Sequence, residues 1–141
     1  MKSAKWMLSV TFLLLSGLMA AQSITSTTVV ANVPFEFMVG NKAMPAGDLA
    51  IRAVNQDGRI LTVSNFDART STLAAASHME NRRPAESTQL LFKVYGNQRY
   101  LAGIRIEGSN LTYTLPVSPG EADLRAHNVP YSETTLLAAL K

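Results

Sequence analysis

The stretch TQLLFKVYGNQRYLAGIRI, residues 88–106, decides the fold of this chain. Apolar side chains recur with a period of two in both halves of it, which places successive side chains on opposite faces of an extended strand. The glycine and asparagine at 96–97 supply a tight turn between the halves. The stretch therefore predicts a β-hairpin. The expected apolar face of its second strand is formed by Tyr100, Ala102, Ile104 and Ile106.

Further strands are predicted on the N-terminal side of this hairpin. Alternation over 33–39 indicates a half-buried strand that carries a proline near its start. The turn chemistry of Pro45-Ala46-Gly47 leads into a strand at 49–53, and the polar turn at 55–58 joins that strand to another at 60–64. These two strands are expected to pair as a second hairpin.

Two segments mix helical and extended signals. The segment TSTLAAAS at 70–77 combines alanines with threonines and serines, and we predict a strand there. The tail segment TTLLAAL at 134–140 fits a last strand or a terminal helix equally well.

A short helix is predicted after a strand at 111–115. Ser118 is the expected N-cap, Pro119 the first helical residue, and Glu121 is placed to reach back as in a capping box. The helix should end near Ala126.

About six to eight short strands with frequent turns predict an all-β fold, a single antiparallel β-sandwich or small barrel with a short C-terminal helix. The chain has no cysteine, so its stability has to come from packing without disulfides. The absence of cysteine in an exported protein also favours a bacterial origin.

The first 21 residues have the pattern of a secretory signal peptide, which we expect to be helical. Lys2 and Lys5 precede the apolar run WMLSVTFLLLSGL at 6–18, and the run ends at Ala20 and Ala21, either of which fits as the last signal residue. A transmembrane anchor is the alternative, but it needs about 20 apolar residues. The expected organisation is a signal peptide at 1–21, a flexible leader at 22–31 and one β domain at 32–141.

Export predicts a periplasmic or extracellular protein, with membrane contact only through the signal segment before cleavage. The chain has thirteen Lys and Arg residues and ten Asp and Glu residues, and cleavage would remove Lys2 and Lys5. The mature protein would therefore be close to neutral. A nucleic-acid partner is not expected, because such partners require clustered basic side chains.

Several short motifs lie at turns and at apolar positions of the expected β domain. They are Val33-Pro34-Phe35-Glu36-Phe37, Gly40 with Lys42, Pro45-Ala46-Gly47, Leu91-Phe92 with Tyr95-Gly96 and Arg99-Tyr100-Leu101, and Leu115-Pro116-Val117-Ser118 with Glu121. In this pattern the chain resembles a family of small secreted bacterial proteins of unknown function. It departs from the family at Leu49, where an aromatic residue is common, and at Lys93-Val94, where a His-Arg pair is common. The resemblance implies a shared fold and no particular reaction.

No catalytic motif is present in the sequence. It contains no nucleophile elbow, phosphate-binding glycine loop, dinucleotide fingerprint or His-Glu-x-x-His motif. His78 and Glu80 are the only close pair of potential metal donors around a histidine, and a solvated loop is the expected role of their segment. The sequence therefore predicts a protein that is not an enzyme and uses no cofactor or metal.

Candidate contact residues are three tyrosines and one basic pair. Tyr95, Tyr100 and Tyr113 fit either core packing or an aromatic surface that stacks on sugars or flat ligands. Arg82 and Arg83 fit a solvated loop or a contact with a partner.

Two functions agree with these observations. The first is a binding or envelope-associated interaction module, with an envelope protein or polymer as partner at a sheet edge or at the loops of one end. The alternative is a small-ligand carrier with an apolar cavity. The expected cavity lining is Phe35, Phe37, Tyr100 and Tyr113.

Overall fold

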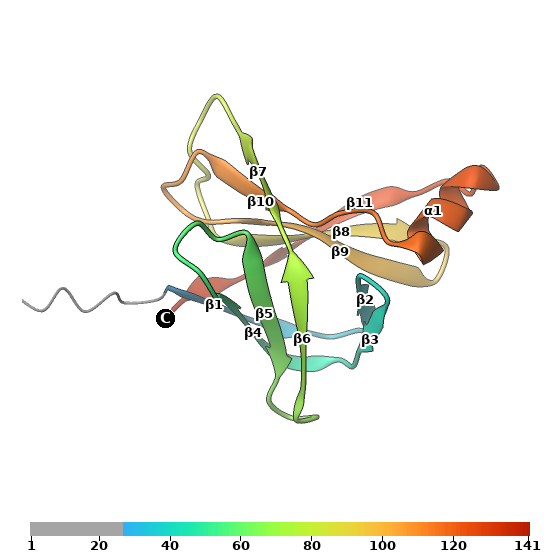
Figure 1. The fold of residues 1–141 in the computed structure, drawn as a ribbon, viewed down its shortest axis with the longest axis horizontal. Coiled ribbons are helices and arrows are strands. Elements are labelled where there is room, and N and C mark those ends of the chain that lie inside the picture. The colour runs from blue at the N-terminus through green and yellow to red at the C-terminus, as the bar shows by residue number, and fades with distance from the viewer. Residues whose placement is uncertain (1–26) are drawn as a thin grey trace, which may run out of the picture.

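The structure, a computed structural model, describes residues 27–141. Its strands form two sheets that pack face to face as a β-sandwich, with one short helix at one end (Figure 1). This confirms the all-β prediction and decides between its two alternatives in favour of the sandwich. The predicted signal peptide and the leader residues 22–26 lie outside the described residues.

The first sheet consists of five antiparallel strands in the order β12-β1-β4-β5-β6. Their bounds are β1 Thr28–Val33, β4 Gly47–Ala53, β5 Ile60–Asn65, β6 Thr70–Ala75 and β12 Ala139–Leu140. The hairpin predicted from 49–53 and 60–64 is confirmed as β4 and β5, in which Leu49 lies opposite Asn65 and Ala53 opposite Leu61.

The second sheet has the order β11-β8-β9-β10-β7 and carries two additional short strands. The bounds of the main strands are β7 Ser77–Glu80, β8 Gln89–Tyr95, β9 Gln98–Arg105, β10 Leu111–Thr114 and β11 Ser132–Leu137. The additional strands are β2 (Phe37–Val39), which runs parallel to β9, and β3 (Lys42–Met44), which pairs with β2. The hairpin predicted from 88–106 is confirmed as β8 and β9.

The start of the domain differs from the prediction in two ways. The predicted strand 33–39 is divided, because β1 ends at Val33 and β2 begins at Phe37, with Pro34 and its missing N–H group between them. In addition, β1 begins at Thr28, so residues 28–31 of the predicted flexible leader belong to the first sheet. They pair with β4, and Val29 is buried, which outweighs the polar composition of the residues before it.

Two strands pass from one sheet into the other and close the two sides of the sandwich. The strand predicted at 70–77 is confirmed as extended chain, but it leaves the first sheet at Ala75 and enters the second at Ser77. At this corner the N–H group of Ala76 donates to the carbonyl of Arg59 at 2.7 Å. The tail makes the second corner at Ala138, between β11 and β12, so the open choice between strand and helix is decided in favour of strands.

A β-bulge changes which side chains of β9 face the core. Leu91 lies opposite Gly103 and Phe92 opposite Leu101, which leaves Ala102 as the extra residue. The predicted face is therefore confirmed for Ile104 and Ile106 and wrong for Tyr100 and Ala102. Leu101 and Ile104 are both buried in the core, whereas Tyr100 lies beside Tyr95 outside the core cluster.

The predicted helix is present as α1 (Pro119–Ala126). Ser118 is its N-cap, and the Ser118 hydroxyl accepts a hydrogen bond from the N–H group of Glu121 at 3.2 Å. Pro119 occupies the first helical turn, as predicted. Among the described residues, no helix has the length and apolar character needed to span a membrane.

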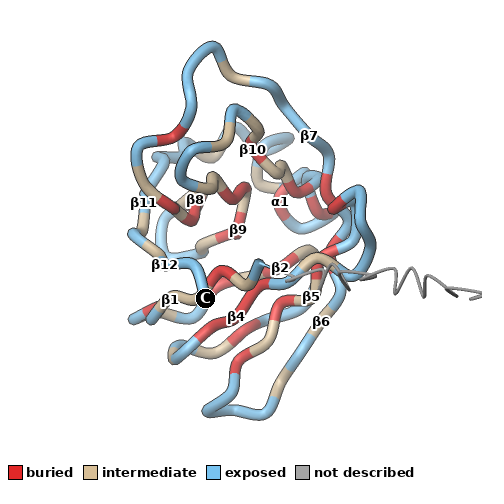
Figure 2. The backbone as a smooth tube through the Cα atoms, turned by 90° about the vertical axis from the view of Figure 1, so that its left-hand side faces the viewer, coloured by how far each residue is buried: buried red, intermediate tan, exposed pale blue. Residues whose placement is uncertain are grey.

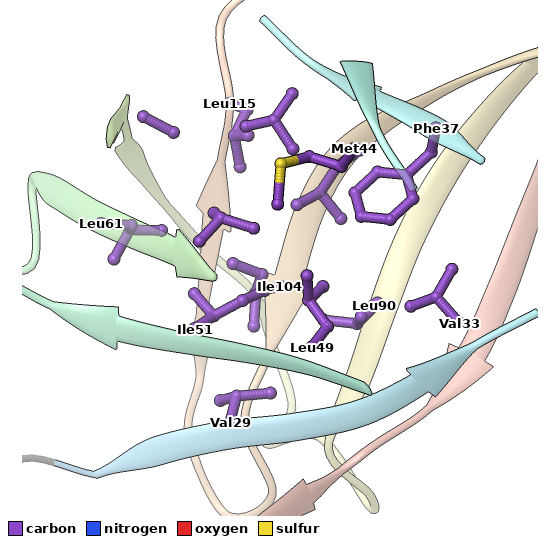
Figure 3. Close-up of a cluster of buried hydrophobic side chains, with 14 of the residues drawn as sticks. Val29, Val33, Phe37, Met44, Leu49, Ile51, Leu61, Leu90, Ile104 and Leu115 are labelled. Carbon is purple, nitrogen blue, oxygen red and sulfur yellow. The ribbon is translucent and has the colours of Figure 1, made fainter. Parts of the chain in front are cut away.

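The hydrophobic core fills the space between the sheets. Buried positions alternate along the facing strands, and Figure 2 shows them on the inner sides of both layers. Side chains from both sheets meet there (Figure 3). The largest fully buried apolar side chains are Phe37, Phe92, Met44, Leu49, Leu90, Ile104, Val33 and Val63.

Candidate functional site

An apolar cleft with a volume of about 530 Å³ opens at one end of the sandwich. Its lining includes Thr27 at the start of the described chain, and in Figure 1 this start lies at the end of the molecule opposite α1. Its volume is within the range of roughly 300–1,000 Å³ that is typical of small-ligand pockets. The lining residues are Thr27, Val29, Ile51, Ala53, Val54, Asn55, Gln56, Leu61, Ile104, Ile106, Ser109 and Tyr113.

Strands of both sheets provide the floor of the cleft. Val29 of β1, Ile51 of β4, Leu61 of β5 and Ile104 of β9 are each at most 4% exposed and belong to the core cluster. They occupy inward positions of their strands, where the alternation of the sequence places apolar side chains. The cleft therefore lies directly over the hydrophobic core.

The rim of the cleft is mostly polar because turns form it, although the exposed Val54 also belongs to it. Asn55 and Gln56 lie in the turn between β4 and β5, and Ser109 lies in the turn between β9 and β10. Thr27 completes the rim at the start of the described chain. The cleft therefore combines an apolar floor with a rim of hydrogen-bonding groups.

Tyr113 forms one wall and is held in place from two sides. The ring of His78 meets the Tyr113 ring edge to face, with the ring centres 4.9 Å apart. On another side lies Gly58, which is buried and has a φ of +66°. A Cβ atom at this position would lie 2.7 Å from Cε1 of Tyr113, which is too close. Glycine is therefore needed here for the β4–β5 turn to pack against the tyrosine ring.

The other two candidate tyrosines lie elsewhere, near α1. The Tyr95 hydroxyl donates to Oε1 of Glu121 at 2.8 Å and accepts from Nε of Arg125 at 3.0 Å. Nη2 of Arg125 also donates to Oε1 of Glu121 at 3.2 Å. The Glu121 carboxylate thus binds side chains of β8 and α1 instead of completing the capping box predicted for it. We call Tyr95, Glu121 and Arg125 the helix clasp, because they fasten α1 to the second sheet.

Burial governs the ionisation of both tyrosines. Desolvation raises the pKa of Tyr95, while its hydrogen bond from Arg125 partly opposes that rise. The pKa of Tyr100 is raised by burial and then by the negative charge of Glu121. Both hydroxyls therefore stay protonated at neutral pH and act as hydrogen-bonding groups of the structure.

The carrier lining predicted from four aromatic residues is wrong, because only Tyr113 lines the cleft. Phe35 and Phe37 instead pack edge to face against Phe92, with ring centres 5.1 and 5.4 Å apart. Phe37 and Tyr100 border a second hollow of about 480 Å³, which also has Glu36, Gln98 and Arg99 in its lining. The polar lining of this hollow makes it a poorer candidate for an apolar ligand.

Arg82 and Arg83 are exposed in the loop between β7 and β8. This agrees with the solvated loop expected for them. His78 packs on Tyr113, and within 27–141 no group of three or more His, Cys, Asp or Glu side chains is arranged to hold a metal ion.

Sequence reasoning missed most of the residues at both places. The cleft floor was expected to be ordinary core, and Val29 was assigned to the leader. Glu121 was noticed only as a capping residue, and Tyr131, whose ring centre lies 5.2 Å from that of Tyr95, was not noticed at all. Comparison of the chain with known family models, with curated proteins and with solved structures gives no match.

Proposed function

We propose that this chain is a non-enzymatic binding protein that holds a small, largely apolar ligand in the cleft. The observation that carries the proposal is a concave apolar surface in which the partly exposed side chains of Ala53, Ile106 and Tyr113 lie over buried residues of the core. Apolar surface that stays accessible in a concave site is typical of ligand pockets, whose polar groups are few and placed to orient the ligand.

The path of the chain supports a cleft ligand over a partner at a sheet edge. Strands that change sheets at Ala76 and Ala138 close both sides of the sandwich. On the free side of β6, Nζ of Lys42 donates to the carbonyl of Ser71 at 2.9 Å. Sheet edges that are joined to the other sheet, or whose carbonyl groups already accept hydrogen bonds, are less suited to pair with a strand of a partner.

Filling the cleft tests the proposal. Ala53 lines the cleft, and leucine at this position would occupy part of its volume. We expect the neutral dye N-phenyl-1-naphthylamine, which fluoresces in apolar surroundings, to bind the native protein and to bind Ala53→Leu about tenfold more weakly, equivalent to about 1.4 kcal/mol.

Ala75→Leu is the matched control. Ala75 is exposed on β6, opposite Ile60, so this variant adds the same side chain away from the cleft and should bind the dye as the native protein does. Thermal melts would verify that both variants are folded. Equal binding by Ala53→Leu, or no binding by the native protein, would refute the proposal.

We further infer that the protein is exported. Two lysines, an apolar run at 6–18 and the small residues Ala20 and Ala21 support a cleaved signal peptide. Mass spectrometry of protein recovered outside the cytoplasm should find an N-terminus at Ala21 or Gln22. Recovery only from the cytoplasm, with residues 1–21 still attached, would contradict this inference.

We also infer kinship with the small secreted bacterial proteins that the chain resembles. The motifs behind the resemblance occupy structurally demanding positions. Val33 and Phe37 are buried, and Gly47 has a φ of +141°, with space for a Cβ blocked by Oδ2 of Asp67 at 2.7 Å. Such positions support a common fold. The identity of the ligand depends instead on the residues that line the cleft. A protein that carries all these motifs but folds with a different strand order would refute the kinship.

A further inference from the structure

Resting on the proposed function, we propose that the cleft ligand is an uncharged amphiphile. Its apolar chain lies on the floor, and its head group, a neutral hydrogen-bond acceptor such as an ester or a ketone, lies at the rim. Three features of the cleft carry this inference: the separation of apolar and polar lining, the absence of charge in that lining, and the hydrogen bonds that the rim already makes.

The first feature is the separation of floor and rim. Strand residues line the inner part of the cleft with aliphatic side chains, whereas turn residues place amides and hydroxyls at its mouth. In Figure 1 the two turns and the start of β1 lie at the same end of the molecule. A ligand that satisfies both parts has an apolar body and a single polar end.

The second feature is the neutrality of the lining. Of the described residues that line the cleft, none is Lys, Arg, His, Asp or Glu. The charged residues of the nearby turn, Asp57 and Arg59, pair with each other at 3.6 Å, and their side chains are largely exposed to solvent. A carboxylate or ammonium head would lose hydration at the rim without gaining a countercharge, which is unfavourable.

The third feature is the direction of the rim hydrogen bonds. Oγ of Ser109 accepts from the N–H group of Leu111 at 3.1 Å, and Oδ1 of Asn55 accepts from the N–H group of Ile60 at 3.3 Å. Because each of these oxygens already accepts one hydrogen bond inside the protein, the hydroxyl hydrogen of Ser109 and the amide hydrogens of Asn55 are the parts of these two side chains best placed to bind a ligand. The rim therefore favours a head group that accepts hydrogen bonds.

A matched series of ligands tests the head group. Displacement of N-phenyl-1-naphthylamine from the full chain would be measured with methyl decanoate, decanoate, decylammonium and decane. The two charged ligands would be kept below their micelle concentrations, and the two neutral ones below their solubility in water. Methyl decanoate should bind most tightly. Decanoate and decylammonium should bind at least about tenfold more weakly, because their heads are charged.

A variant of the rim connects the preference to a residue. Ser109→Ala should weaken methyl decanoate binding about fivefold, as expected for loss of one hydrogen bond, and leave decane binding unchanged. Ser87→Ala is the control, since the Ser87 hydroxyl accepts from Gln89 and does not line the cleft. It should change neither ligand.

The possible results separate this inference from the proposed function. If all four ligands displace the dye equally, or if a charged one binds most tightly, the head-group inference is overturned while the cleft proposal stands. An unchanged ester affinity in Ser109→Ala overturns the role of the rim donors. If the native protein does not bind the dye at all, the proposed function fails first.

Discussion

Replacement of Phe92 by alanine is expected to lower the free energy of unfolding by about 3–5 kcal/mol, the usual cost of removing a buried aromatic ring. Phe92 is 1% exposed and lies at the middle of β8, an interior strand of the second sheet. Its ring meets the rings of Phe35 and Phe37 edge to face, so its loss would also remove a surface on which the start of the domain packs.

Phe66→Ala is the control for this substitution. Phe66 follows β5 and is 66% exposed, so the same change there should alter the free energy of unfolding by no more than about 0.5 kcal/mol. Urea denaturation would give both values. A loss below about 1.5 kcal/mol for Phe92→Ala would show that the aromatic cluster is not the central support of the core that its burial implies.

The strands were the most predictable part of this protein, because each hairpin is encoded locally. Alternation and turn residues predict β4, β5, β8 and β9 from the sequence alone. The bulge at Ala102 escapes such reasoning, because an extra residue in one strand is defined by its partner strand. The corner at Ala76 escapes it for the same reason, since extended chain looks alike in both sheets.

The sites were harder to predict, because they join residues that are distant in sequence. Tyr95 and Glu121 are 26 positions apart, and only the docking of α1 brings their side chains together. The cleft floor looks like any set of core positions. It becomes a cleft because the β4–β5 and β9–β10 turns border the core without covering it, and turn placement of this kind is not encoded in hydrophobic periodicity.

The buried side-chain amide of Asn65 should contribute as much to stability as a large side chain of the core. Asn65 is 1% exposed at the end of β5. Its Nδ2 donates to the carbonyls of Pro45 at 2.9 Å and Ala46 at 3.3 Å, and its Oδ1 accepts from the N–H group of Ala68 at 3.0 Å. One side chain thus satisfies the turn before β4 and the turn after β5, which explains why a polar residue is kept in the interior.

Asn65→Asp is expected to cost about 3–5 kcal/mol at pH 7, although the side chain keeps its shape. An oxygen would replace the NH₂ group and face two carbonyl oxygens, and burial would raise the pKa of the new carboxyl in the folded state. Because a carboxyl with a raised pKa binds its proton more tightly when folded, the loss should shrink as the pH falls from 7 towards about 4. The protonated acid can again donate to Pro45.

The measurement is urea denaturation of the native protein and Asn65→Asp at several pH values, with Asn97→Asp as control. Asn97 is exposed in the β8–β9 turn, so its replacement should change the free energy of unfolding by no more than about 0.5 kcal/mol at any of these pH values. A cost for Asn65→Asp that stays constant with pH would mean that the carboxylate remains solvated. The hydrogen bonds of Asn65 to the two turns would then not be sheltered from water in solution.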